Sequence, residues 1–281
     1  MESKNGTRRR GVYLLPNLLT SAALFAAFYS IISGINGKYE VAAIAIIVAG
    51  LLDGLDGRVA RLTNTQSDFG EQYDSLADVI SFGLAPALLA FNWSLSSLGD
   101  ISVLTGKLGW LAAFLFVACA ALRLARFNTQ VGIADKRYFQ GLASPAAAGT
   151  LVFTIWFFVE NDVAGASVRW LVFFETIVLG LLMFSNVRYF SFKTGPRGDK
   201  VPAYWIFFAI LIIVLLALDP PVIGMIVGIA YVISGLVMTI AGRRNRKYKR
   251  EHRPRRFRKT EPVMDTASDA ADGDDEDPQP G

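Results

Sequence analysis

The chain has 281 residues, of which 53% are hydrophobic and only 19% are charged, with a formal net charge of +4 and a mean hydropathy of +0.39. A soluble globular protein does not bury that much apolar surface, so the composition excludes the ordinary soluble classes and indicates a membrane protein. The single cysteine, Cys119, excludes an internal disulfide and is interpreted as a small core residue.

Eight apolar segments recur along the chain, most of them close to the roughly 20 residues that a helix needs to cross a bilayer. We expect membrane helices at residues 14–35, 41–61, 73–93, 108–124, 144–160, 169–189, 202–218 and 222–241. The first segment follows a basic cluster, as a signal peptide does, but it is too long and ends in no small-residue cleavage site, so we expect it to be retained. The predicted fold class is all-α, a polytopic membrane helix bundle of about eight transmembrane helices.

The basic residues are divided unevenly between the two sides of this predicted bundle. If both termini lie on one side, that side receives 25 of the 28 Lys and Arg residues, and only Lys38, Lys107 and Arg169 lie opposite. Loops rich in Lys and Arg stay in the cytoplasm. We therefore expect a multi-pass protein of the cell inner (cytoplasmic) membrane with both termini facing the cytoplasm.

The composition changes abruptly after the last apolar segment. Residues 1–241 form one predicted membrane catalytic domain, whereas residues 242–281 begin with a basic run and end with an acidic one. Such a segment is predicted to be a disordered cytoplasmic tail. Because the basic run directly follows a helix end and contains no folded nucleic-acid module, membrane lipid is the predicted partner and nucleic acid is not.

Carboxylates interrupt the second and third apolar segments. Asp53 and Asp56 are three residues apart, and Asp74 and Asp78 are four apart, so each pair shares one helix face. The short link at residues 62–69 makes the two helices an antiparallel hairpin in which all four carboxylates converge. Carboxylates within membrane helices are costly, and this cluster is therefore the candidate active site.

Four carboxylates about 6 Å apart would repel by about 3 kcal/mol per pair at an effective dielectric near 20. Protonation would relieve the repulsion, but oxygen ligands at a water-facing mouth suit hard divalent cations better, with Mg²⁺ or Mn²⁺ as the natural choices. Two such ions are what a phosphoryl-type displacement needs. The only histidine, His252, lies in the tail, so a carboxylate must be the general base, and Asp78 lies deepest.

Small and charged residues surround the two pairs. Gly57 and Ala60 would let a nucleotide approach the backbone closely, and Arg61 is placed to hold a phosphate. The alternative for the two small residues is helix packing. Asp68 and Glu71 are interpreted as the N-cap of the third helix and its capping-box partner.

This pattern resembles the signature of the CDP-alcohol phosphotransferase family, DxxDGxxAR, eight residues, GxxxDxxxD. The matching residues are Asp53, Asp56, Gly57, Ala60, Arg61, Gly70, Asp74 and Asp78. The resemblance implies a six-helix core, a homodimer, two metal ions held by the four aspartates, and Asp78 as the proton acceptor.

The resemblance also implies which residues contact the CDP-lipid. These are Pro16, Asn17, Asp56, Gly57, Ala60, Arg61 and Ser67. Ser67 resembles a hydroxyl residue that touches phosphate in relatives. Pro16 and Asn17 resemble the nucleotide-facing start of the family's first core helix.

Further segments resemble the integral-membrane bacterial phosphatidylserine synthases of that family. These are residues 14–20, 69–87, 121–128, 141–149 and 185–193. The resemblance implies transfer of a phosphatidyl group from CDP-diacylglycerol to L-serine, with release of CMP. Arg123 and Arg126, one turn apart, are our candidates for the serine carboxylate, with positive-inside anchoring as the alternative. The loop at Ser144 and Pro145 is expected to line the same cavity.

Two other interpretations of the aspartates stay open. The same chemistry could use glycerol phosphate, inositol phosphate or choline as the acceptor, although a phosphorylated acceptor would need a denser basic pocket than Arg123 and Arg126 provide. A cation transporter also uses intramembrane carboxylates, but near the bilayer midplane. The predicted cluster lies instead at the cytoplasmic mouth and has no second copy in the other half of the sequence.

Overall fold

The computed structural model describes residues 6–63, 65–130, 138–190, 207, 210–211, 214–215 and 217–251. Residues Met1–Arg243 form one compact unit, and Arg244–Gly281 form a second. The predicted segment 202–218 falls largely outside the described residues. The prediction of disorder is wrong for residues 242–251, because they continue the helix α9 (Pro220–Glu251). Residues 252–281 lie outside the described residues, so the disorder of that part of the tail stays a prediction.

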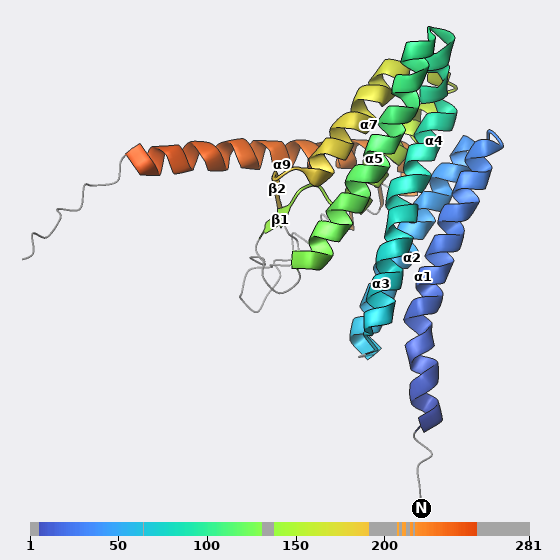
Figure 1. Ribbon diagram of the computed structural model, residues 1–281, viewed down its shortest axis with the longest axis vertical. Helices are drawn as coiled ribbons and strands as arrows, with labels where there is room; N and C mark the ends of the chain where they lie inside the picture. Colours follow the sequence, from blue (N-terminus) through green and yellow to red (C-terminus); the bar gives the residue numbers. More distant parts are fainter. Residues whose placement is uncertain are drawn as a thin grey trace, which may run out of the picture. The chain divides into compact units, whose positions relative to one another are not determined.

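Helices occupy the other seven predicted segments, and the all-α membrane fold class is confirmed (Figure 1). The main helices are α1 (Gly6–Ile35), α2 (Tyr39–Thr63), α3 (Asp68–Asp78), α4 (Ala85–Trp93), α5 (Val103–Gln130), α6 (Ser144–Glu160), α7 (Arg169–Phe184) and α9 (Pro220–Glu251). Shorter helical turns are η1 (Val79–Leu84), η2 (Leu95–Asp100) and η3 (Gly165–Ser167). Among the described residues, four helical stretches are long and apolar enough to cross a membrane: Leu15–Ile35, Asp68–Trp93, Val103–Thr129 and Pro220–Thr239.

The third membrane segment is one continuous helix with a wide turn in its middle. α3 leads into the π-helical turn η1 and then into α4 without a break. The Ala85 N–H donates to the Ile80 carbonyl, five residues back, as in a π-turn. Pro86 follows directly and has no N–H to donate to Phe82, which favours a local departure from the α-helical ladder.

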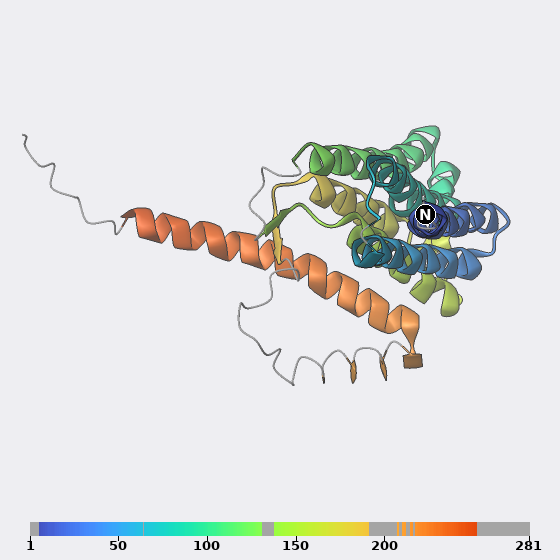
Figure 2. The ribbon, with the colours of Figure 1, turned by 90° about the horizontal axis from the view of Figure 1, so that it is seen from below.

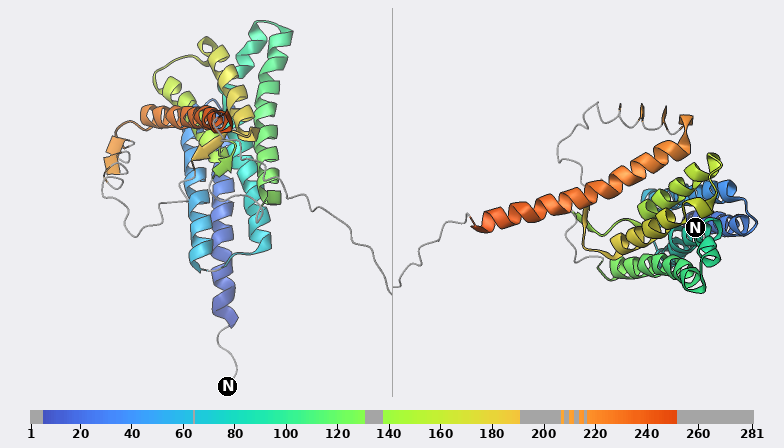
Figure 3. Two further views of the ribbon diagram at one scale, coloured as in Figure 1. Left: turned by 90° about the vertical axis from the view of Figure 1, so that its left-hand side faces the viewer. Right: turned by 90° about the horizontal axis from the view of Figure 1, so that it is seen from above.

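Small side chains let the first helices pack closely. α1 and α2 run side by side, as Figures 1 and 3 show. Ala27, Ala42 and Ala43 are fully buried, which is the small-residue packing expected where apolar side chains gain nothing by leaving lipid. The Ser30 hydroxyl adds a 2.8 Å hydrogen bond to the Ala42 carbonyl across the two helices.

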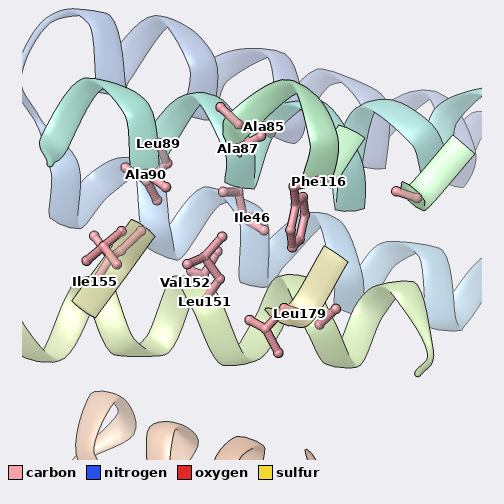
Figure 4. Packing of buried hydrophobic residues seen from close by; sticks show 14 of the residues in the cluster. Ile46, Ala85, Ala87, Leu89, Ala90, Phe116, Leu151, Val152, Ile155 and Leu179 are labelled. Carbon is pink, nitrogen blue, oxygen red and sulfur yellow. The ribbon is translucent and has the colours of Figure 1, made fainter. Parts of the chain in front are cut away.

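The larger core side chains lie between α4, α5, α6 and α7. Leu89, Phe116, Leu151 and Ile155 are buried and point toward one another (Figure 4). Gly180 of α7 allows a close approach, because a Cβ atom there would lie 3.3 Å from the Phe116 Cα. Figure 2 shows these helices from below, with α1 and α2 adjacent.

One short strand pair was not predicted from the sequence. β1 (Tyr138–Gln140) pairs antiparallel with β2 (Arg188–Phe190). The prediction of a helix over 169–189 was wrong at its end, because α7 stops at Phe184 and Ser185 adopts extended backbone. Gly141 has φ +85° and lies against the Met183 carbonyl, a place where only glycine fits. The strand pair thereby fixes the segment that leads into α6.

Candidate active site

The hairpin of α2 and α3 brings three carboxylates together. Asp53 and Asp56 stand on one face of α2, and Asp74 stands on α3. One carboxylate oxygen from each lies within 4.8 Å of the other two. The spacing of three residues therefore puts Asp53 and Asp56 on one helix face, and the hairpin brings Asp74 to them, as predicted.

The fourth aspartate lies beside this group. The carboxyl group of Asp78 is within hydrogen-bonding reach of Asp53. Two carboxyl groups this close need a shared proton or a cation between them. The structure thus places all four predicted aspartates in one neighbourhood, with Asp78 paired to Asp53 and outside the tightest group of three.

A threonine of α1 completes the group from a third helix. The Thr20 Oγ1 donates a 2.6 Å hydrogen bond to the Asp56 Oδ2, and its oxygen lies 3.1 Å from the Pro16 carbonyl. Thr20 and Asp56 are each only 4% exposed. Sequence reasoning missed Thr20, because an uncharged hydroxyl in an apolar helix gives no hydropathy signal. Its position in the 14–20 segment was the only indication.

The carboxylate oxygens that accept no hydrogen bond show whether a metal ion suits this site. The Asp74 Oδ1 is buried and has no hydrogen-bond partner among the described residues. A buried carboxylate oxygen without a donor is costly unless a cation satisfies it. Clustered carboxylate oxygens are also the ligands that hard divalent cations prefer. The donor set therefore fits a divalent metal ion.

The start of α3 differs from the prediction in its cap. Ser67 is the N-cap: its backbone is extended, and its Oγ accepts a 3.1 Å hydrogen bond from the Gly70 N–H. Asp68 and Glu71 are therefore not the N-cap and its capping-box partner, because the helix already begins at Asp68. Both carboxylates lie in the first turn, where they stabilise the positive end of the helix dipole.

Ser67 and Gly70 meet α1 at Asn17. A Cβ atom at Gly70 would lie 3.1 Å from the Ser67 Oγ and 3.2 Å from the Asn17 Oδ1, so glycine keeps this junction open. Pro16 and Asn17 do not begin α1, as the resemblance suggested, because the helix already starts at Gly6. They lie inside it, level with the start of α3.

Gly57 and Arg61 lie together near the end of α2. A Cβ atom at Gly57 would lie 3.7 Å from the Arg61 Nη1, so the guanidinium extends back over the glycine. Arg61 is exposed and Ala60 is half-buried. The charged group predicted to hold a phosphate is therefore accessible and lies five residues along α2 from Asp56.

Arg123 faces the same site from α5. Its Nη1 donates a 2.9 Å hydrogen bond to the buried Ser144 Oγ at the start of α6. Its guanidinium is close enough to Asp78 and to Tyr231 of α9 to interact with both electrostatically. The Nε atom is buried and has no partner among the described residues. The structure thus brings Arg123, Ser144 and Asp78 together, and adds Tyr231, which sequence reasoning missed.

Arg126 is engaged differently. Its Nη2 donates a 2.7 Å hydrogen bond to the Asn186 Oδ1, and its Nη1 lies 3.4 Å from the Phe184 carbonyl. These contacts connect α5 to the end of α7. Two residues further on, Asn128 donates a 3.0 Å hydrogen bond to the Ser75 Oγ of α3.

Comparisons with known proteins identify the family. A sequence model of the family described as CDP-alcohol phosphatidyltransferase matches residues 13–242. A Helicobacter pylori protein named CDP-diacylglycerol–serine O-phosphatidyltransferase is 36% identical over 233 residues, which cover 80% of this chain and 91% of that protein. An archaetidylserine synthase of Methanothermobacter thermautotrophicus is 35% identical over 193 residues, covering 67% of this chain and 72% of the relative. The aspartate cluster, with the helices that carry it, lies inside the matched region, and the chain belongs to the CDP-alcohol phosphatidyltransferase family.

Proposed function

We propose that this enzyme transfers the phosphatidyl group of CDP-diacylglycerol to L-serine, giving phosphatidylserine and CMP. The observation that carries the proposal is a carboxylate cluster next to a partly buried arginine: Asp78 lies beside Asp53, and Arg123 faces Asp78. The carboxylate cluster supplies a base, and Arg123 supplies the positive charge that the carboxylate of an amino-acid acceptor needs. The names of the similar proteins from Helicobacter pylori and Methanothermobacter thermautotrophicus support serine as the acceptor. Because the family consists of transferases, cation transport is not proposed.

Asp53, Asp56, Asp74 and Asp78 are proposed to hold two divalent cations, Mg²⁺ or Mn²⁺. The convergence of three of these carboxylates within 4.8 Å and the unpartnered Asp74 Oδ1 support this role. Bound divalent cations supply positive charge that orients the pyrophosphate and stabilises the leaving phosphate. Thr20 holds the Asp56 carboxylate in one orientation, so that its other oxygen stays available.

Asp78 is proposed to act as the general base. It accepts the proton of the serine hydroxyl, and the serine oxygen forms a bond to the lipid-side phosphorus. The bond between that phosphorus and the bridging oxygen breaks, and CMP leaves with the electron pair. Asp78 then returns its proton to the solvent or to CMP.

Arg123 is proposed to bind the serine carboxylate, since its buried Nε can donate to an incoming oxygen and its Nη1 is fixed by Ser144. Arg126, the second candidate, already contacts Asn186, and we propose a weaker contribution from it. Tyr231 lies near Arg123 and is proposed to help position its guanidinium.

The CDP-lipid is proposed to bind where the part of α1 around Asn17 meets the end of α2 and the start of α3. The contributing residues are Pro16, Asn17, Asp56, Gly57, Ala60, Arg61 and Ser67. The accessible Arg61 guanidinium and the open junction at Gly70 support a nucleotide and phosphate site here. The Ser67 hydroxyl accepts from Gly70 and can still donate its own hydrogen to a phosphate oxygen.

We further propose a homodimer in the cell inner membrane, with the active site and both termini facing the cytoplasm. The excess of Lys and Arg on the side of the termini supports this orientation. Residues 242–281 are proposed to form a cytoplasmic tail whose basic run binds anionic lipid headgroups.

One experiment tests the activity and its acceptor. The purified protein in detergent receives CDP-diacylglycerol, Mg²⁺ or Mn²⁺, and labelled L-serine, glycerol phosphate, inositol phosphate or choline in parallel. We expect labelled phosphatidylserine and stoichiometric CMP in the serine reaction alone. If another acceptor drives CMP release, that acceptor takes the place of serine in the proposal. If CMP is released when no acceptor is added, the reaction is not a group transfer and the proposal is contradicted.

A further inference from the structure

A second polar site lies within the membrane helices, away from the aspartates. Glu175 stands on α7, six residues from Arg169, which is about 9 Å along a helix that rises 1.5 Å per residue. Carboxyl groups inside membrane helices are costly and are seldom present without a function. None of the proposed catalytic steps uses this residue.

Only half of the Glu175 carboxyl group is satisfied. Its Oε1 accepts a 2.8 Å hydrogen bond from the Thr154 Oγ1 of α6. Its Oε2 is buried and has no partner among the described residues. A purely structural role in joining α6 to α7 would explain the first oxygen, but it leaves the second as an uncompensated cost.

A cavity of about 300 Å³ adjoins this carboxyl group. Its walls come from α6, α7 and α9, and eight of its eleven lining residues are apolar, the others being Thr150, Thr154 and Glu175. Leu171, Val178, Ile229 and Ile233 line it and are also exposed, so the cavity opens on the outer, apolar surface of the helices. Its lining shares no residue with the aspartate cluster.

Size and chemistry define what this cavity accepts. Its volume is at the lower end of the range of roughly 300–1,000 Å³ that ligand sites occupy, too small for a whole phospholipid. The walls match an alkyl chain, and the unpartnered Oε2 matches one hydrogen-bond donor. We propose that the cavity binds a single-chain amphiphile from the membrane, with a hydroxyl or ammonium group on Glu175 and the chain between α7 and α9.

Three probes of equal chain length distinguish the effect of a hydrogen-bond donor from the effect of the alkyl chain. We would use photoreactive dodecylamine, dodecanol and dodecyl methyl ether on the full chain in nanodiscs, and locate labelled residues by mass spectrometry. Saturable labelling of α6, α7 and α9 by the amine or the alcohol is expected, at least tenfold stronger than labelling by the ether. The stronger of the two donors then identifies the ligand class.

Variants connect the labelling to one carboxyl group. Glu175→Leu is expected to reduce donor-probe labelling to the level of the ether, and Glu175→Gln to reduce amine labelling more than alcohol labelling. Glu160→Gln, an exposed carboxyl group at the end of α6, is the matched control and should change nothing. Glu175→Gln keeps the inference testable if Glu175→Leu does not fold. Equal labelling by all three probes, no saturable labelling, or a cross-link to a second copy of the chain would overturn the inference.

Discussion

Thr20 of α1 donates a 2.6 Å hydrogen bond to Asp56 of α2, so the acidic cluster is held by three helices rather than by the two that carry its carboxylates. The bond holds the Asp56 Oδ2 in place and leaves the other carboxylate oxygen available to a ligand. It also couples the packing of α1 to the geometry of the site.

Thr20→Val removes this hydrogen bond and keeps the shape of the side chain. A hydrogen bond to a charged group contributes about 1.5–3 kcal/mol, so we expect the Mg²⁺ or Mn²⁺ concentration for half-maximal activity to rise roughly tenfold or more. Metal titrations of the transfer rate measure this. Thr20→Ser keeps the hydroxyl and should stay close to the wild type, and an unchanged metal requirement in Thr20→Val would assign the bond to packing alone.

Asp74→Asn should abolish the stabilisation of the protein by divalent cations. A ligand that binds only the folded state stabilises it by about 2.7 kcal/mol at 100 times its Kd. We expect Mg²⁺ or Mn²⁺ to raise the thermal midpoint of the wild type, a chelator to reverse the rise, and Asp74→Asn to show neither effect. Glu71→Gln alters an exposed carboxylate on the same helix and should respond like the wild type. A metal-induced rise that survives in Asp74→Asn would place the ions elsewhere.

Asp78→Asn should fold normally and lose turnover. General base catalysis contributes about 10²–10⁴-fold, so we expect at least a 100-fold fall in kcat. The rate of CMP formation at saturating serine measures it, and the thermal midpoint shows that the fold persists. Asp68→Asn, exposed in the first turn of the same helix, should keep its rate. Normal turnover in Asp78→Asn would assign the proton to another group.

Arg123→Lys should weaken serine binding more than it slows chemistry. Lysine keeps the charge but loses the forked donors that hold Ser144 and an incoming carboxylate together. We expect the KM for serine to rise roughly tenfold, with a smaller change in kcat. Arg126→Lys is the comparison, and its KM should change less because Arg126 already contacts Asn186. Equal effects of the two changes would contradict the assignment of the carboxylate to Arg123.

Gly228→Val should destabilise the contact between α9 and α6. A Cβ atom at Gly228 would lie 2.7 Å from the Thr150 Oγ1, so any larger residue separates the helices. Overpacking of this kind costs about 1–3 kcal/mol, and we expect a lower thermal midpoint in detergent. Ala230→Val, on an exposed position of the same helix, should leave the midpoint unchanged.

The helices and the aspartate cluster could be predicted from the sequence because both depend on patterns that repeat over a few neighbouring residues. Hydropathy located seven helical segments among the described residues. The spacing of three residues put Asp53 and Asp56 on one face of α2, and the short hairpin link brought Asp74 to them. Contacts between distant segments were not predictable in this way. Thr20, 36 residues from Asp56, and Tyr231, 108 residues from Arg123, have no local signal.

The ends of two helices also differ between the prediction and the structure, and each difference has a physical cause. The cap of α3 was predicted one residue late, since both Ser67 and Asp68 are good N-cap residues and only backbone geometry distinguishes them. The helix over 169–189 was predicted too long, because the strand partner that ends it comes from residues 138–140. The hydropathy of residues 185–189 alone does not reveal that pairing.

The wide turn at Val79–Leu84 makes the length of the third membrane segment as important as its composition. A π-turn holds one residue more than an α-turn, so it lets this segment carry the extra residue while α3 and α4 keep the faces that they present. If the same residues followed a regular α-helix, Asp74 and Asp78 would turn by about 100° relative to α4 and away from Asp53, although the hydropathy of the segment would not change. The backbone path of this stretch is therefore as necessary to the carboxylate cluster as the carboxylates themselves.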